Sequence, residues 1–495
     1  MKIKYIICFL IILSFAVGLS SCSFIVINGG DDTEAPAPDT SSAVTDTESE
    51  SFVRVPDGAK EAKKKADALV AALPSHKFAK DSFSIAAAPG IDLAPADPAD
   101  EYEDALIERN KTVEAKYGIN VLQIETPLDL MLSDAYSAYL SGSFYADAML
   151  IPQKAVGEFL QKGFLLNSQS IPHVDFNKEY FDADAMSQAS AGYASPVIAG
   201  SATKDIGSYY CVYVNTALLG EEGEKELRET VKNGSWTWDE LIGTARAVSA
   251  LNGNVGMIGS GTEGILVDTV YLSSGQHYLD TGYQKIPAMA FETETTLKII
   301  GLLRTMYDSG AVFDSGAGSG SEIDEFRKGN VLFHADTVNN MSEVARMGAG
   351  WTVLPVPKLD PEQETYLAYC SPDAPVMVVP AGNPDTADAG YAIEALNAAS
   401  YGYLDRCYYN RLVRTSVNNS RTLDMIDYIG GVKAGRGVYD FTSMYGGVFD
   451  RLAFNTSETV RELAVKGGDI AVAAYNSRYD MNWRFVNAFP MSKDR

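Results

Sequence analysis

Cysteine and histidine often bind metals or act as nucleophiles, but their spacing in this sequence supports neither role. The chain has five cysteines and four histidines: Cys8, Cys22, Cys211, Cys370, Cys407, His76, His173, His277 and His334. The histidines are scattered without the spacing of metal ligands, and the cysteines beyond residue 22 are too far apart for a zinc motif or a dense disulfide framework. We therefore expect neither a metal nor a cofactor.

Two other patterns associated with chemistry are also weak. The stretch SGAGSGSE (315–322) lacks the Gly-Lys-Ser/Thr ending of a phosphate-binding loop, and no apolar strand precedes it directly, so we interpret it as a surface loop. The 65 acidic residues leave room for a catalytic carboxylate pair, but no Gly-x-Ser-x-Gly nucleophile motif is present. We expect a protein that is not an enzyme, and a secreted glycoside hydrolase stays open as the alternative.

The N-terminus gives Cys22 a recognisable context. Two lysines precede an apolar run from Ile6 to Val17, which is shorter than the roughly 20 residues of a membrane-spanning helix and matches the core of a secretion signal. The run closes on Leu19-Ser20-Ser21-Cys22, which resembles the lipobox of bacterial lipoproteins. This resemblance implies that residues 1–21 are a signal peptide and that Cys22 is lipidated. The alternative is an ordinary secretion signal with a chance cysteine.

The segment after Cys22 is acidic and polar. Residues 28–51 contain seven acidic residues and neither lysine nor arginine. Such a segment cannot bury enough surface to offset its chain entropy, so residues 22–56 are predicted to form a disordered tether. The whole chain carries a net charge of −25 with 46% hydrophobic residues, which indicates a folded body that repels nucleic acid.

Beyond the tether, strand and helix patterns alternate. A lead-in helix is predicted within 57–78, followed by strands at 83–89, 119–125 and 146–152 and helices at 98–118, 128–142 and 153–163. This order predicts an α/β fold with parallel strands and helical crossovers. The size of the body favours two lobes, and strand-like runs near 207–216 and 365–380 are the predicted crossings between them. Lobe 1 would comprise 79–207 and 368–418, and lobe 2 would comprise 213–364 and 424–495.

Three motifs resemble family 1 extracellular solute-binding proteins of ABC transporters: GSWTWDELIGTARAV (234–248), FRKGNVLFHAD (326–336) and GWTVLPVPK (350–358). The resemblance implies a two-lobed periplasmic-binding-protein-like fold, in which each lobe is a mainly parallel sheet flanked by helices and a multi-strand hinge joins them. Cys211 and Cys370 would then lie on neighbouring hinge strands, with or without a bond. Trp238 is expected to pack inside its lobe and Trp236 to be exposed.

The same resemblance implies a function. The chain would capture a small solute, a mono- or oligosaccharide, and deliver it to the membrane subunits of an ABC permease. We expect a monomer, held outside the cytoplasm on the bacterial membrane by its lipid. A sensor lipoprotein with the same fold but no permease stays open as a further alternative.

Five residues are predicted to bind the ligand, which we expect to be a neutral carbohydrate. Gln153 and Asp336 follow predicted strands, at the edge where ligands bind in open α/β sheets. Tyr271 and Gln276, in LVDTVYLSSGQHYLD (266–280), and Tyr445, in SMYGGVFD (443–450), match positions near the ligand in the resembled family. Two alternatives remain: Tyr271 as a core residue, and Asp336 as the cap of a helix starting near Thr337.

Overall fold

The computed structural model describes residues 58–445, apart from 97, 253–254, 260–264, 286, 291–292, 315–320, 349, 418–419 and 430–436. These residues belong to one unit, which spans 51–495. The predicted signal peptide, Cys22, the tether, the glycine-rich loop at 315–320 and the segment beyond 445 lie outside the described residues. No helix in the described ranges is long and apolar enough to cross a membrane.

The first sheet has four strands in the order β14-β3-β1-β2. Its strands are β1 (Ser82–Ala87), β2 (Asn120–Glu125), β3 (Ala148–Pro152) and β14 (Pro375–Val378). Strand β1 pairs in parallel with β2 and β3, whereas β14 returns antiparallel along β3. The helices α2 (Glu101–Tyr117) and α3 (Leu128–Ser141) connect β1 to β2 and β2 to β3. The predicted alternation of strands and crossover helices in this part of the chain is thus confirmed.

Helix α2 begins and ends where its sequence provides caps. The Asp100 side chain accepts hydrogen bonds from the N–H groups of Tyr102 and Glu103, which satisfies two amides of the first turn. The helix ends at Gly118, whose φ of 69° is the left-handed conformation that glycine adopts without strain. These caps fix the first turn of α2, which carries Tyr102 and Glu103 beside the end of β1.

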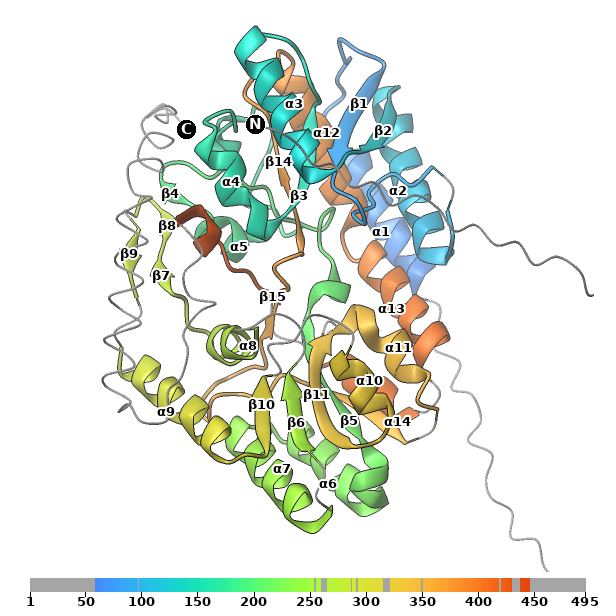
Figure 1. The fold of residues 1–495 in the computed structure, drawn as a ribbon. Coiled ribbons are helices and arrows are strands. Elements are labelled where there is room, and N and C mark those ends of the chain that lie inside the picture. Colours follow the sequence, from blue (N-terminus) through green and yellow to red (C-terminus); the bar gives the residue numbers. More distant parts are fainter. Residues whose placement is uncertain are drawn as a thin grey trace, which may run out of the picture. The chain divides into compact units, whose positions relative to one another are not determined.

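The second sheet has five strands in the order β10-β6-β11-β5-β12. They are β5 (Tyr210–Asn215), β6 (Val255–Gly259), β10 (Val312–Asp314), β11 (Val331–Thr337) and β12 (Trp351–Pro355). Strands β10, β6 and β11 are parallel, and β5 runs antiparallel to both of its neighbours. Helix α7 (Trp238–Asn252) packs against β6 (Figure 1). The α/β architecture with two helix-flanked sheets agrees with the predicted fold class.

Smaller elements complete the described part of the chain. The remaining helices are α1 (Ala59–Ala72), α4 (Val156–Gln161), α5 (Ala183–Gln188), α6 (Gly220–Lys232), α8 (Ile265–Ser273), α9 (Glu294–Asp308), α10 (Ser321–Arg327), α11 (Met341–Ala345), α12 (Thr386–Ser400), α13 (Tyr403–Ser416) and α14 (Ser420–Ile426). Three two-stranded sheets pair β13 (Ala368–Tyr369) with β15 (Gly437–Val438), β4 (Ala191–Gly192) with β8 (Gly282–Tyr283), and β7 (Leu279–Asp280) with β9 (Ala288–Met289).

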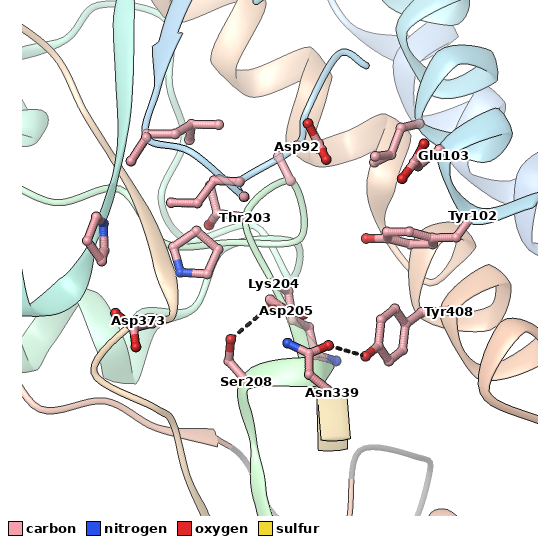
Figure 2. Close-up of a pocket in the computed structure, with 18 of the residues that line it drawn as sticks. Asp92, Tyr102, Glu103, Thr203, Lys204, Asp205, Ser208, Asn339, Asp373 and Tyr408 are labelled. Carbon is pink, nitrogen blue, oxygen red and sulfur yellow. Dashed lines mark hydrogen bonds between the residues drawn. The ribbon is translucent and has the colours of Figure 1, made fainter. Parts of the chain in front are cut away.

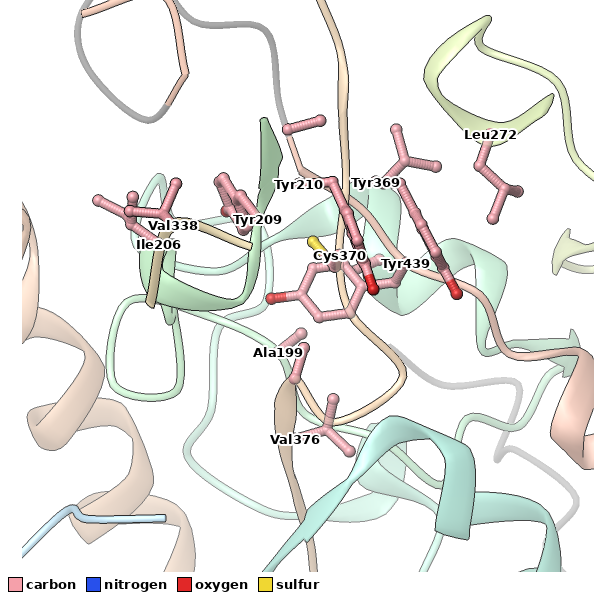
Figure 3. Close-up of a cluster of buried hydrophobic side chains, with 14 of the residues drawn as sticks. Ala199, Ile206, Tyr209, Tyr210, Leu272, Val338, Tyr369, Cys370, Val376 and Tyr439 are labelled. Carbon is pink, nitrogen blue, oxygen red and sulfur yellow. The ribbon is translucent and has the colours of Figure 1, made fainter. Parts of the chain in front are cut away.

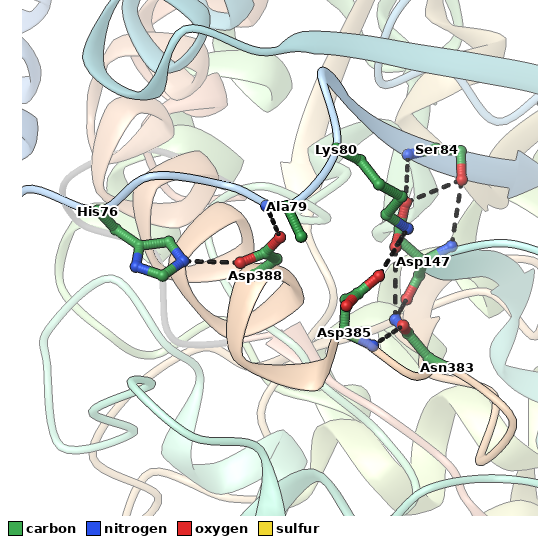
Figure 4. Close-up of polar contacts among 8 residues, drawn as sticks. All are labelled: His76, Ala79, Lys80, Ser84, Asp147, Asn383, Asp385 and Asp388. Atoms are coloured by element: carbon green, nitrogen blue, oxygen red, sulfur yellow. Dashed lines mark hydrogen bonds and ion pairs between the residues drawn. The ribbon is translucent and has the colours of Figure 1, made fainter.

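The segment after the lead-in helix α1 is tied to the first sheet and to α12 by buried carboxylates (Figure 4). Asp388 accepts from the N–H of Ala79 at 2.7 Å and lies 2.6 Å from His76 Nε2. Asp147, just before β3, pairs with Lys80 at 2.6 Å and accepts from the backbone and hydroxyl of Ser84. These contacts fix the N-terminal edge of β1 and β3, which leaves their carboxyl ends at the opposite edge.

The two predicted crossing segments lie side by side. Tyr209 forms an antiparallel bridge with Cys370, and the Ser371 N–H donates to Ser208 O at 2.7 Å. Figure 3 shows Tyr209, Cys370 and Tyr439 gathered in one buried cluster. Cys211, two residues beyond the bridge, lies on the neighbouring strand as predicted, and both cysteines are free thiols. The exact lobe boundaries stay a prediction.

The start of α7 confirms one expectation and corrects another. Trp238 is fully buried, as expected, and Thr237 Oγ1 accepts from the Glu240 N–H at 3.4 Å ahead of the helix. Trp236 was expected at the surface, but it is also fully buried. Its indole N–H donates to Pro355 O at 2.9 Å, so the ring packs at the end of β12 with its polar atom satisfied.

Candidate functional site: a cavity at the strand ends

A cavity of about 350 Å³ lies at the carboxyl ends of β1 and β3. Its walls come from the loop after β1, the first turns of α2, the last residues of β3, the approach to β5, the start of β14, and α13. The second sheet contributes Asn339, which follows β11. The polar and aromatic residues that line it include Arg411 and, labelled in Figure 2, Asp92, Tyr102, Glu103, Thr203, Lys204, Asp205, Ser208, Asn339, Asp373 and Tyr408.

The loop that carries Asp92 is held by two polar side chains, the half-buried Gln123 and the buried Arg109. The chain turns at Gly90, whose φ is 80°, and Gln123 Oε1 accepts from the N–H groups of Leu93 and Ala94. The Arg109 guanidinium, fully buried, donates to Leu93 O at 2.8 Å and to Ser400 Oγ at 2.7 Å. Burial lowers the pKa of Arg109 to about 10, which leaves it charged at neutral pH. The rim of the cavity is therefore built on a fixed support.

Two tyrosines form one wall. The rings of Tyr102 and Tyr408 meet edge to face, with centroids 5.3 Å apart, and the guanidinium carbon of Arg411 lies 4.8 Å and 4.5 Å from their respective centroids. The Tyr408 hydroxyl donates to Asn339 Oδ1 at 3.0 Å. Burial, followed by the charge of Asp205, raises the pKa of both phenols, so both stay neutral and can donate hydrogen bonds.

Asp205 also lines the cavity, near the wall formed by the two tyrosines (Figure 2). Its carboxylate accepts from the Gly207 N–H at 2.9 Å and from the Ser208 hydroxyl. Burial raises the pKa of Asp205, and these donors and the charge of Arg411 only partly offset that effect. The Asp205 carboxylate, at the end of the segment 202–205, therefore offers a hydrogen-bond acceptor to the cavity. The hydroxyl and amide groups of neighbouring side chains face the same cavity (Figure 2).

Such an arrangement can bind a small polyhydroxylated molecule. Tyrosine rings offer apolar area with a polar tip, and the amide, hydroxyl and carboxylate groups offer both donors and acceptors. In the described ranges no group of three His, Cys, Asp or Glu side chains is placed to hold a metal ion. A second cavity, of about 260 Å³, lies on another side of Lys204 and Tyr408 and is also lined by Arg406, Tyr409 and Asp427.

Gln153, the first predicted ligand contact, is fully buried and bound to the backbone of the crossing segments. Its Nε2 donates to Cys370 O at 2.9 Å and to Ser371 O at 2.6 Å, and its Oε1 accepts from the Asp440 N–H at 2.8 Å. Its neighbour Pro152, also buried at the end of β3, lines the cavity. The strand-end argument therefore points to the edge of the sheet where this cavity lies.

Tyr271 and Gln276 lie at and beyond the end of α8. Tyr271 is buried, stacks on Tyr278 with centroids 4.3 Å apart, and bonds Thr296 Oγ1 at 3.1 Å. Gln276 is half-buried. Neither residue lines the 350 Å³ cavity.

Asp336 and Tyr445 are also outside the lining of the cavity. Asp336, buried in β11, accepts from the Thr337 N–H at 2.7 Å and from Asn340 Nδ2 at 2.8 Å, so it organises the turn that presents Asn339. Tyr445 is the last residue of a short 3₁₀ helix, Thr442–Tyr445, and its side chain lies outside the described part of the chain.

Most lining residues were missed from the sequence, although some carried a signal. Ligands bind at the carboxyl ends of strands in open α/β sheets, and the end of the predicted strand at 83–89 leads to Asp92 as the end of the strand at 146–152 leads to Gln153. Asp373 lies within a crossing segment that the sequence analysis had marked. Tyr102, Tyr408 and Arg411 come from helix faces, and no local pattern distinguishes them from ordinary packing residues.

No protein-family model matches the chain, and comparison with curated proteins finds no match. Solved structures do share its fold. A putative oligosaccharide periplasmic-binding protein from Synechococcus sp. MITs9220 matches with a TM-score of 0.51 at 12% identity, covering 82% of this chain and 100% of that chain. The galacto-N-biose/lacto-N-biose I-binding protein of an ABC transporter from Bifidobacterium longum matches with a TM-score of 0.50 at 11% identity, covering 83% and 98%. A cyclo/maltodextrin-binding protein complexed with maltotetraose matches with a TM-score of 0.50 at 14% identity, covering 84% and 99%. The chain therefore has the predicted two-lobed periplasmic-binding-protein-like fold.

Proposed function

We propose that this protein captures a carbohydrate in the 350 Å³ cavity and delivers it to the membrane subunits of an ABC permease. The observation that carries the proposal is the position of the cavity at the carboxyl ends of β1 and β3, where Tyr102, Tyr408 and several hydrogen-bonding side chains converge. The three structures with the same fold are named as binders of oligosaccharides or carry one, which supports the choice of ligand.

The proposed contacts are the residues that line the cavity. Gln153 and Asp336 would support the site from behind, because the bonds described above engage their polar groups with the protein itself. Gln276 and Tyr445 remain candidate contacts from the sequence. We propose binding without turnover, so a bound sugar would be recovered unchanged, and a cleaved sugar would indicate the hydrolase alternative.

We further propose that the protein acts as a monomer outside the cytoplasm and is anchored to the membrane through Cys22. The lipobox-like sequence supports this anchor. Cys22→Ala should abolish the incorporation of labelled fatty acid. Labelled lipid on the variant would disprove the anchor and leave the binding proposal unaffected.

A thermal-shift screen against mono- and oligosaccharides tests the binding proposal. A ligand present at 100 times its dissociation constant stabilises a protein by about 2.7 kcal/mol, which is readily detected. We expect at least one carbohydrate to raise the melting temperature, and to do so less in Tyr408→Ala. If no carbohydrate shifts the wild-type protein, the proposal is wrong.

A further inference from the structure

The lining of the cavity is richer in acids than in bases. Asp92, Glu103, Asp205 and Asp373 contribute four carboxylates, whereas the cations of the lining are Lys204 and Arg411. Simple recognition of neutral hydroxyl groups does not require this imbalance, because amides and hydroxyls serve equally well as partners.

Both cations are already engaged by acids behind the lining. Lys204 Nζ lies 3.0 Å from Asp405, and Arg411 lies 3.1 Å from Asp100. Asp373 forms an ion pair with Lys154, whose Nζ lies 2.6 Å from the carboxylate. With Arg109, the charged guanidinium beneath the rim, six acids and four bases are gathered in and directly around the cavity, which leaves an excess of about two negative charges.

Asp92, Glu103 and Asp205 are the acids of the lining that the ion pairs above leave out. In the described part of the chain, none of these three forms an ion pair with a lysine or arginine. The Asp205 carboxylate accepts from the Gly207 N–H and from the hydroxyl and backbone N–H of Ser208, and it lines the cavity without a cationic partner among the described residues.

A metal ion does not account for the excess, because no three of the described acids or histidines are close enough together to hold one. An organic cation needs no such coordination shell. It needs a carboxylate partner and a polar or aromatic wall, and both are present where Asp205, Ser208 and Tyr408 face the same space (Figure 2).

We propose that the ligand is an amine-bearing, positively charged saccharide, whose ammonium group is bound by the carboxylate of Asp205 beside Ser208 and Tyr408. This inference rests on the proposed function and refines it, and it departs from the neutral carbohydrate that the sequence analysis predicts. A charged hydrogen bond of this kind corresponds to a difference of about 10- to 150-fold in affinity.

Matched ligand pairs that differ in charge at the same position provide the test. Calorimetric titration of the full chain in detergent would compare glucosamine, galactosamine and chitosan di- to tetrasaccharides with their N-acetylated, neutral counterparts. We expect the amines to bind more tightly by about 10- to 150-fold and to lose most of that advantage at high salt.

Charge-neutralising variants identify the carboxylates. Asp205→Asn should remove most of the preference for the amine and Glu103→Gln a smaller part of it, whereas Asp104→Asn should leave it unchanged. Asp104 is the matched control because it is an exposed acid in the first turn of α2, next to Glu103, and outside the cavity lining.

The outcomes separate this inference from the proposed function. If neutral sugars bind and amines bind no better, the inference is wrong and sugar capture stands. If the amine sugars bind more tightly but all three variants keep the same preference for them, these carboxylates do not bind the ammonium group and the inference is again wrong. If no sugar binds, both proposals fail.

Discussion

The two crossing segments, which we propose as the hinge, lie next to the cavity but differ from it in how their polar groups are used. At this proposed hinge, Tyr209, Cys211, Cys370 and Tyr439 are all buried, and the amide of Gln153 uses both its N–H groups and its oxygen on backbone partners. In the cavity, carboxylates outnumber the cations that face them. This difference indicates where a ligand would bind. Polar groups that are hydrogen-bonded within the protein stabilise the fold, whereas polar groups without such partners can bind a ligand.

The largest expected effect is the loss of the hinge amide. Gln153→Ala removes the amide that bonds the Cys370 carbonyl and the Asp440 N–H, at about 1–3 kcal/mol for each group, whereas the Ser371 carbonyl still accepts from the Ala374 N–H. We expect the free energy of unfolding in urea to fall by at least about 2 kcal/mol. Gln161→Ala, at an exposed position in α4, is the control and should change it by less than about 0.5 kcal/mol. A loss below about 1 kcal/mol in Gln153→Ala would mean that water replaces the amide.

The next effect comes from hinge packing. A Cβ atom on Gly437 would lie 2.6 Å from the Tyr209 ring and 2.7 Å from Cys370 Sγ, both in the buried cluster. Gly437→Ala should therefore destabilise the protein by about 1–3 kcal/mol through overpacking. Gly243, in the middle of α7, has open space around the same position, and Gly243→Ala should stabilise by about 0.5–1 kcal/mol. Equal changes in the two variants would show that the hinge tolerates extra volume.

The smallest effect has the opposite sign and belongs to the cavity. Burial raises the pKa of Asp205 in the folded state, so its ionisation stabilises the unfolded chain relative to the fold. Protonated Asp205 therefore favours the folded state below the ordinary pKa of about 3.9. This contribution to stability is lost as the pH rises through the higher pKa that Asp205 has in the folded protein. Asp205→Asn should therefore raise the melting temperature at pH 7, and the gain should shrink towards pH 3.5. A variant that melts lower than wild type at pH 7 would contradict this account.

Much of the fold could be predicted from the sequence because its signals are local. The caps of α2 at Asp100 and Gly118 and the buried strand 148–152 follow directly from residue type and periodicity. The burial of Trp236 could not be predicted, because it depends on a carbonyl at Pro355, more than a hundred residues away.

The site was less predictable, because it is assembled from distant segments. Tyr102 and Tyr408 lie on α2 and α13, and only the packing of these two helices brings their rings together. Gln153 was selected by the rule for strand ends, but that rule gives the edge of a sheet and does not say which polar groups the protein itself will engage. That distinction requires the hydrogen-bond partners.

Hydrogen–deuterium exchange with a sugar from the screen tests most directly whether the cavity is the binding site. Our account predicts slower amide exchange in segments 88–92, 202–208 and 371–375, which border the cavity, with little change at 153–156 in the hinge. Binding that protects the residues around the second cavity, 402–412 and 426–427, and leaves 88–92 and 202–208 unchanged would contradict it.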